Sequence, residues 1–138
     1  MNVIGIIPAR MGSSRYPGKP LEKIHGMPMI GHCYYRTAMA LGADKVYVAT
    51  CDTEIYDYII SIGGNAVMTN DAHIRATTRT AEALEKIEIE IGKRIDVVVM
   101  VQGDEPAIQP SKIRETVPYF QDNSIDIVNI ISRISTKK

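Results

Sequence analysis

Continuous apolar runs alternate along the chain with segments in which apolar residues recur at helical spacing. Runs of this kind are expected of strands that helices cover on both faces of a sheet. The predicted strands are residues 2–8, 45–50, 65–69, 95–102 and 126–132. The predicted helices are residues 28–41, a second one from Asp52 or Thr53 to about 62, residues 77–91, and a last one that begins at Pro110 or Ser111.

The resulting order, βαβαβαβαβ, predicts the fold class. Helices between successive strands favour a mainly parallel sheet with right-handed crossovers and helices on both faces, which is a three-layer α/β/α architecture. Residues 1–138 fit one domain, because a single hydrophobic core commonly takes about 100 to 200 residues. Ligands of such sheets bind beyond the carboxyl ends of the strands, near the point where the strand order reverses.

The composition is that of an ordinary globular protein, with 45% hydrophobic and 23% charged residues. No segment reaches the roughly 18 consecutive apolar residues of a membrane span, and the first residues lack a leader pattern, so we expect a cytoplasmic protein without a membrane partner. Sixteen basic residues balance sixteen acidic ones, which argues against nucleic acid as a partner. Cys33 and Cys51 are too few for a disulfide framework and lack the spacing of a zinc site.

The loop that follows the first predicted strand concentrates positive charge around glycines. Between residues 10 and 23 the chain has four basic residues and one acid, a local net charge of +3. Gly12 and Gly18 permit close backbone approach, and Arg10 and Lys19 supply the positive charge that phosphate oxygens require. The loop is not a Walker A motif, because five residues separate its glycines and a proline follows Lys19. On charge and glycine alone, a solvated basic turn is the alternative.

The stretch IIPARMGSSRYPGKPL at residues 6–21, with GMPMI at 26–30, resembles the segment that opens sugar nucleotidyltransferases of the CMP-Kdo synthetase type, the 3-deoxy-manno-octulosonate cytidylyltransferases. CMP-sialic acid synthetases and spore-coat polysaccharide cytidylyltransferases share a looser version. The resemblance implies a Rossmann-like fold of the nucleotide-diphospho-sugar transferase type, in which this loop wraps the triphosphate of CTP. The nucleotide-binding residues that it implies here are Ala9, Arg10, Gly12, Ser13, Ser14, Arg15 and Lys19.

A second motif, QGDEP at residues 102–106, ends the fourth predicted strand. A carboxylate there, facing a phosphate loop, suits Mg²⁺, which takes one or two carboxylates together with phosphate oxygens and water. By itself the motif is equally typical of a charged turn. It is similar to the VQGDEP element of the same family, which implies that Asp104 binds the Mg²⁺ cofactor and that Gln102 lies near the nucleotide. Gly103 is expected to make room for the ligand, and Glu105 to be structural.

A third segment, MTNDAH at residues 68–73 followed by Thr77 and Arg79, resembles the family segment that covers the base and ribose of the nucleotide. Thr77 and Arg79 are therefore predicted to bind the nucleotide. An exposed helix arginine is the alternative for Arg79. The chain departs from the family at residues 74–76, where Ile-Arg-Ala replaces the usual Gln-Ser-Gly.

These departures leave base selectivity open. A glycine lost from a loop that approaches the ligand changes the path of that loop, because alanine is penalised at positive φ. Arg75 replaces a lost contact or points to solvent, and Thr78 stands where the family usually has a glutamate. His73 is expected to be a structural hydrogen-bonding residue rather than a catalyst.

The motifs together predict a Mg²⁺-dependent nucleotidyltransferase. As the resemblance implies, the anomeric hydroxyl of an acidic sugar such as Kdo attacks the α-phosphate of CTP and pyrophosphate leaves, with Arg10, Lys19 and Asp104 as the catalytic residues. The chain resembles only the amino-terminal half of the family. Most of the sugar pocket, a further metal carboxylate and much of the contact of a possible homodimer are then expected to be missing, and a truncated or non-catalytic nucleotide-binding module is the alternative.

Overall fold

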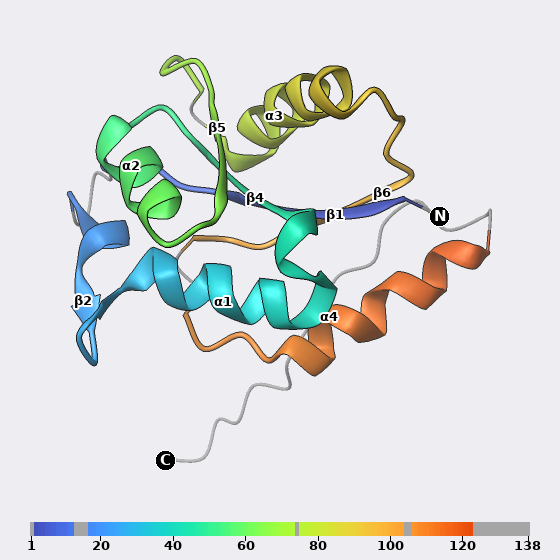
Figure 1. The fold of residues 1–138 in the computed structure, drawn as a ribbon, viewed down its shortest axis with the longest axis horizontal. Coiled ribbons are helices and arrows are strands. Elements are labelled where there is room, and N and C mark those ends of the chain that lie inside the picture. Colours follow the sequence, from blue (N-terminus) through green and yellow to red (C-terminus); the bar gives the residue numbers. More distant parts are fainter. Residues whose placement is uncertain (1, 13–16, 74, 104–105, 123–138) are drawn as a thin grey trace, which may run out of the picture.

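A computed structural model of the chain describes residues 2–12, 17–73, 75–103 and 106–122. Its centre is a parallel sheet of four strands, β1 (Val3–Pro8), β4 (Val46–Thr50), β5 (Asn65–Met68) and β6 (Val97–Met100), in the spatial order β5-β4-β1-β6 (Figure 1). The mainly parallel sheet is thereby confirmed. The strand predicted at residues 126–132 lies outside the described residues.

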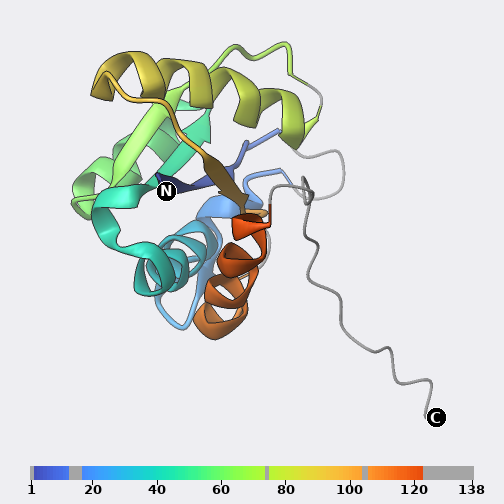
Figure 2. The same cartoon turned by 90° about the vertical axis from the view of Figure 1, so that its right-hand side faces the viewer.

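Helices cover both faces of this sheet. One face carries α1 (Met29–Leu41), α2 (Thr53–Ser61) and α4 (Pro110–Thr116), and the other carries α3 (Ala76–Ile91). Figure 2 shows α3 on one side of the sheet and α1 with α4 on the other. The three-layer α/β/α prediction is confirmed. No helix in the described ranges is long and apolar enough to span a membrane.

The two faces of β1 explain its continuous apolar run. Ile4 and Ile6 pack beneath α3, with Ala83 and Ile87. Ile7 points to the opposite face and joins the core formed with α1 and α2. Each fully buried isoleucine contributes about 1.5 to 3 kcal/mol to stability. Since helices cover both faces of this strand, its residues on both faces are buried and no position favours a polar residue.

A short hairpin before α1 was not predicted. Its strands are β2 (Lys23–Ile24) and β3 (Met27–Pro28), and the turn residues His25 and Gly26 have φ values of 51° and 80°. Positive φ at both turn positions is the signature of a tight two-residue hairpin, in which glycine at the second position is favoured. Helix α1 consequently begins at Met29, with Pro28 as the preceding cap residue rather than the first helical residue.

The sheet order places a topological switch point at β1. The chain moves from β1 outward to β4 and β5, and α3 then crosses back so that β6 pairs with the other edge of β1. Strand order therefore reverses at β1, and the loops after β1 and β6 flank the crevice where ligands of such sheets bind. These are the two loops that the sequence singles out.

Candidate nucleotide-binding site

The loop after β1 is anchored at its start by backbone and carboxylate contacts. Ala9 is buried, and its N–H donates to the Ala49 carbonyl of β4 at 2.9 Å. The Met11 N–H donates to Oδ2 of Asp52 at 2.7 Å, and the Met11 carbonyl accepts from the Gly18 N–H at 2.8 Å. Both ends of the loop therefore meet at Met11. Of the predicted residues here, Ser13, Ser14 and Arg15 lie outside the described residues.

The two predicted phosphate ligands of this loop are exposed. Arg10 follows Ala9 at the carboxyl end of β1, and Lys19 is the first residue of η1, a 3-10 turn over Lys19–Leu21. Gly18 precedes this turn with φ 79°, a left-handed conformation that glycine adopts without strain. Pro20 is buried in the turn. The turn thus leaves Lys19 exposed to solvent, and the exposed Gly12 lies between the two cations in the sequence.

The loop after β6 lies against the end of β1. The Val101 N–H donates to the Ile6 carbonyl at 3.0 Å, and Gln102 is half-buried next to it. A Cβ at Gly103 would come within 3.0 Å of the Pro8 carbonyl oxygen. The absence of a side chain at Gly103 therefore permits its close contact with the end of β1, and the expected room for a ligand stays a prediction. The predicted Asp104 and Glu105 lie outside the described residues.

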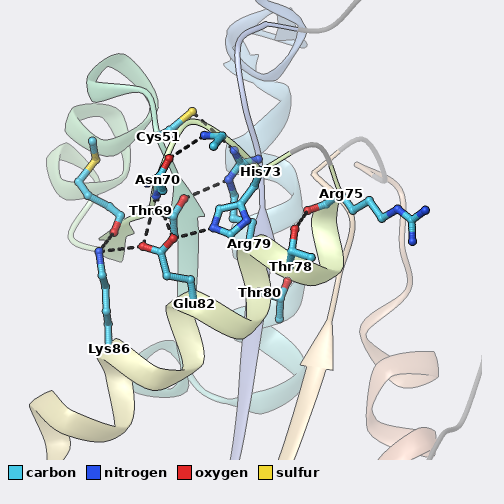
Figure 3. A network of polar contacts seen from close by, with 12 residues as sticks. Cys51, Thr69, Asn70, His73, Arg75, Thr78, Arg79, Thr80, Glu82 and Lys86 are labelled. Atoms are coloured by element: carbon cyan, nitrogen blue, oxygen red, sulfur yellow. Dashed lines mark hydrogen bonds and ion pairs between the residues drawn. The ribbon is translucent and has the colours of Figure 1, made fainter.

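A polar network holds the loop after β5 on α3 (Figure 3). Both carboxylate oxygens of Glu82 lie within 3.2 Å of the Asn70 N–H, Nε2 of His73 donates to Oε1 at 2.6 Å, and Lys86 Nζ lies 2.9 Å from Oε2. The Asn70 hydrogen bond, followed by those from His73 and Lys86, lowers the pKa of Glu82 from 4.5 to about 2. His73 thus makes a hydrogen bond of the kind that was expected of it.

Arg79 is buried beneath this loop, with 3% of its surface exposed. Its Nε donates to Oγ1 of Thr69 at 3.0 Å, and one terminal nitrogen lies 3.7 Å from Sγ of Cys51. The alternative of an exposed helix arginine is wrong. Arg79 instead joins the carboxyl ends of β4 and β5, because Cys51 and Thr69 directly follow these strands. Its predicted contact with a nucleotide stays a prediction.

The remaining residues of this segment face solvent. Thr77 is exposed in the first turn of α3. The side chain of Arg75 is exposed and points away from the Glu82 network (Figure 3). The Thr78 hydroxyl donates to the Arg75 carbonyl at 2.9 Å, a local bond that steadies the start of the helix. Thr77 and Arg75 are therefore available to a ligand, whereas Thr78 is engaged within the chain.

The surroundings of Cys51 disfavour its thiolate form. Burial, followed by the neighbouring Asp52 carboxylate, raises the pKa of the Cys51 thiol above its usual range. The thiol therefore stays protonated at neutral pH, and the thiolate that attacks or binds metals is disfavoured. Across the described ranges no three His, Cys, Asp or Glu residues gather in a way that could hold a metal ion.

The comparison with known proteins bears on this site directly. The model of the family described as "Cytidylyltransferase" matches residues 4–137. The chain belongs to the cytidylyltransferase family.

Named relatives within this family act on eight-carbon sugar acids. The 3-deoxy-manno-octulosonate cytidylyltransferase of Bradyrhizobium diazoefficiens is 44% identical over 136 residues, which is 99% of this chain and 54% of the relative. The 8-amino-3,8-dideoxy-manno-octulosonate cytidylyltransferase of a Shewanella species (strain W3-18-1) is 45% identical over 121 residues, 88% of this chain and 48% of that protein.

A solved structure extends the likeness to three dimensions. A CMP:2-keto-3-deoxy-manno-octonic acid synthetase in complex with CTP superposes with a TM-score of 0.81 and 38% identity, over 90% of this chain and 49% of the synthetase. The cytidylyltransferase chain spans about half the length of the relatives that it matches.

Two carboxylates of this cytidylyltransferase site were not predicted to matter. Asp52 was predicted only as a possible start of the second helix, yet its side chain binds the loop after β1. Glu82 was not singled out within the predicted helix at residues 77–91, yet it gathers three donors. For Glu82 the spacing of four residues to Lys86 was a usable signal. For Asp52 the sequence contains no signal, because its partner Met11 comes from a distant loop.

Proposed function

We propose that the protein takes part in CTP-dependent cytidylyl transfer, in which CMP passes from CTP to an acidic sugar of the Kdo type and pyrophosphate is released. The observation that carries the proposal is the pair of exposed cations, Arg10 and Lys19, held on an anchored glycine loop at the switch point of the sheet. The similarity to a synthetase solved with CTP supports CTP as the nucleotide.

The chemistry asks for positioning and charge neutralisation. A hydroxyl oxygen of the sugar gives up its proton to solvent and forms a bond to the α-phosphorus of CTP. The bond from that phosphorus to the bridging oxygen breaks, and its electron pair leaves with pyrophosphate. Arg10 and Lys19 offset the charge on the phosphate oxygens as it redistributes. The Met11 N–H is bonded to Asp52, and the exposed Gly12 that follows it is proposed to donate its N–H to the triphosphate.

The proposal includes Mg²⁺, with Asp104 as its protein ligand. A carboxylate beside a triphosphate fits this ion, which takes few protein oxygens and completes its shell with phosphate and water. The contact of Gly103, the residue before Asp104, with Pro8, two residues before Arg10, supports this assignment. When bound, Mg²⁺ would withdraw charge from the phosphate oxygens.

Gln102, Thr77 and Arg79 complete the proposed nucleotide site. Gln102 leaves the sheet beside the end of β1, and Arg79 fixes the ends of β4 and β5. A cytoplasmic location and a homodimer are further parts of the proposal. Sedimentation velocity with and without CTP measures the second.

The test is pyrophosphate release from CTP, Mg²⁺ and Kdo, with UTP, ATP and GTP as the nucleotide panel. Lys19→Ala is expected to weaken CTP binding about ten- to a hundredfold, because a charge-assisted phosphate contact is lost. Lys23→Ala is the matched control, since Lys23 is an exposed lysine of the neighbouring strand β2. Thermal stabilisation by CTP without turnover would restrict the function to nucleotide binding, and no stabilisation by any of the nucleotides would refute both.

A further inference from the structure

Asp52 stands at the start of α2 but does not cap it. It occupies the N-cap position with an extended backbone, φ −106° and ψ 122°, yet its side chain makes no capping hydrogen bond. An aspartate in this position usually bonds to a free N–H of the first turn and contributes about 1 kcal/mol. Here Oδ2 accepts from the Met11 N–H of another loop at 2.7 Å. The carboxylate is therefore committed to the loop after β1.

The contact lies at the point that controls both cations of that loop. Met11 follows Arg10 in the chain, and its carbonyl accepts from the N–H of Gly18, which precedes Lys19. A displacement of Met11 would therefore move the backbone next to each cation. The bond from the Met11 N–H to Asp52 is short, at 2.7 Å, and it ties this point of the loop to the start of α2.

Asp52 itself is held by rigid neighbours at the end of β4. Its N–H donates to Oγ1 of the fully buried Thr50 at 3.1 Å, and its carbonyl accepts from the Tyr56 N–H at 3.1 Å. The Cys51 thiol lies 3.7 Å from the Asp52 carboxylate and is also contacted by the buried Arg79 (Figure 3). The loop is thus fastened to the end of a strand of the central sheet, which is what a preorganised site requires.

We propose that Asp52 is the positioning residue of the phosphate-binding loop, acting through the Met11 N–H to hold Arg10 and Lys19 at the spacing that a triphosphate needs. The inference rests on the proposed function. Asp52 makes no contact with the nucleotide in this inference. Nucleotide binding therefore requires a side chain at position 52 that is long enough to accept the Met11 N–H, and requires neither its negative charge nor capping of α2.

Three substitutions at this position separate these roles. Asp52→Asn keeps an acceptor at the same reach and removes the charge. Asp52→Ser is an equally good N-cap residue, but its hydroxyl stops one bond short of the Met11 N–H. Asp52→Ala removes both capacities. Each variant is compared with the parent for the dissociation constants of Mg²⁺-CTP and of inorganic triphosphate by calorimetry, and for urea stability.

The expected result is that Asp52→Ser and Asp52→Ala weaken both ligands about ten- to a hundredfold, while Asp52→Asn stays within about fivefold of the parent. Asp52→Ser should keep the urea midpoint of the parent, which shows that the loss is not one of folding. Unchanged affinity in Asp52→Ser overturns the inference, and so does an equal loss in Asp52→Asn, because the requirement would then lie on the charge. Absence of any CTP binding by the parent would instead overturn the proposed function, and the inference with it.

Discussion

Replacement of Glu82 by glutamine should make the stability of the protein less dependent on pH. The Glu82 carboxylate accepts from Asn70, His73 and Lys86, and these contacts lower its pKa from 4.5 to about 2. A shift of this size corresponds to at most about 3.4 kcal/mol of stability. Because 23% of the side chain is exposed, solvent screening reduces the expected contribution to about 1 to 2 kcal/mol.

The sign of the effect follows from the lowered pKa. The native state holds the carboxylate ionised more strongly than the unfolded chain does, so the contribution is complete above pH 4.5 and is lost as the pH falls towards 2. At pH 3 about two fifths of it is expected to be left.

The assay is urea unfolding at pH 7 and pH 3 for the parent, Glu82→Gln and Glu85→Gln. The free energy of unfolding of Glu82→Gln should fall about 1 to 2 kcal/mol below that of the parent at pH 7, and by less than half as much at pH 3. Glu85 is an exposed acid of the same helix for which the described contacts include no ion pair, so Glu85→Gln should match the parent at both values. The reasoning would be refuted if Glu82→Gln and the parent had the same free energy of unfolding at pH 7, or if their difference were equal at both pH values.

Three further predictions concern the elements around the site. Gly103→Ala should lower the free energy of unfolding in urea by about 1 to 3 kcal/mol, because the added Cβ would meet a backbone oxygen at 3.0 Å. Gly12→Ala, whose added Cβ would meet open space, should change it by less than about 0.5 kcal/mol. Equal effects of the two substitutions would contradict this prediction. Arg79→Lys should destabilise the protein by about 1 to 3 kcal/mol, since the buried hydrogen bond from Nε to Thr69 is lost. Arg75→Lys, at an exposed position, should leave the stability unchanged. Thermal melts of both variants measure the difference. EDTA should abolish pyrophosphate release and excess Mg²⁺ should restore it; release that persists in EDTA would rule out the metal.

The sheet and its two site loops were predictable because their signals are local. A run such as residues 2–8, with no polar face, fits few structures other than a strand covered on both sides. Gly18 and the lysine that follows it indicate a tight basic turn, and this signal does not depend on contacts with distant segments. The hairpin around His25 and Gly26 was missed although the pair carries a signal, since a glycine at the second turn position favours the observed positive φ.

The side-chain partners were not predictable, because they depend on which segments the fold brings together. Asp52 was correctly placed at the start of α2, but the choice between a helix N–H and the Met11 N–H is made by a loop that the sheet positions. Arg79 was expected to reach a nucleotide or solvent, and instead it is buried against the ends of two strands. Spacing along one helix says nothing about such contacts.

The central place of β1 has a consequence for how the site forms during folding. Ile6 of β1 pairs with Met100 of β6, so the loops that carry Arg10 and Gln102 come together only after α3 has returned across the sheet. Pairings between such distant segments form slowly and late. A folding intermediate with β1, β4 and β5 alone would hold Lys19 and Arg10 without the Gln102 loop, and a nucleotide that needs both loops would select the complete sheet and shift the equilibrium towards it.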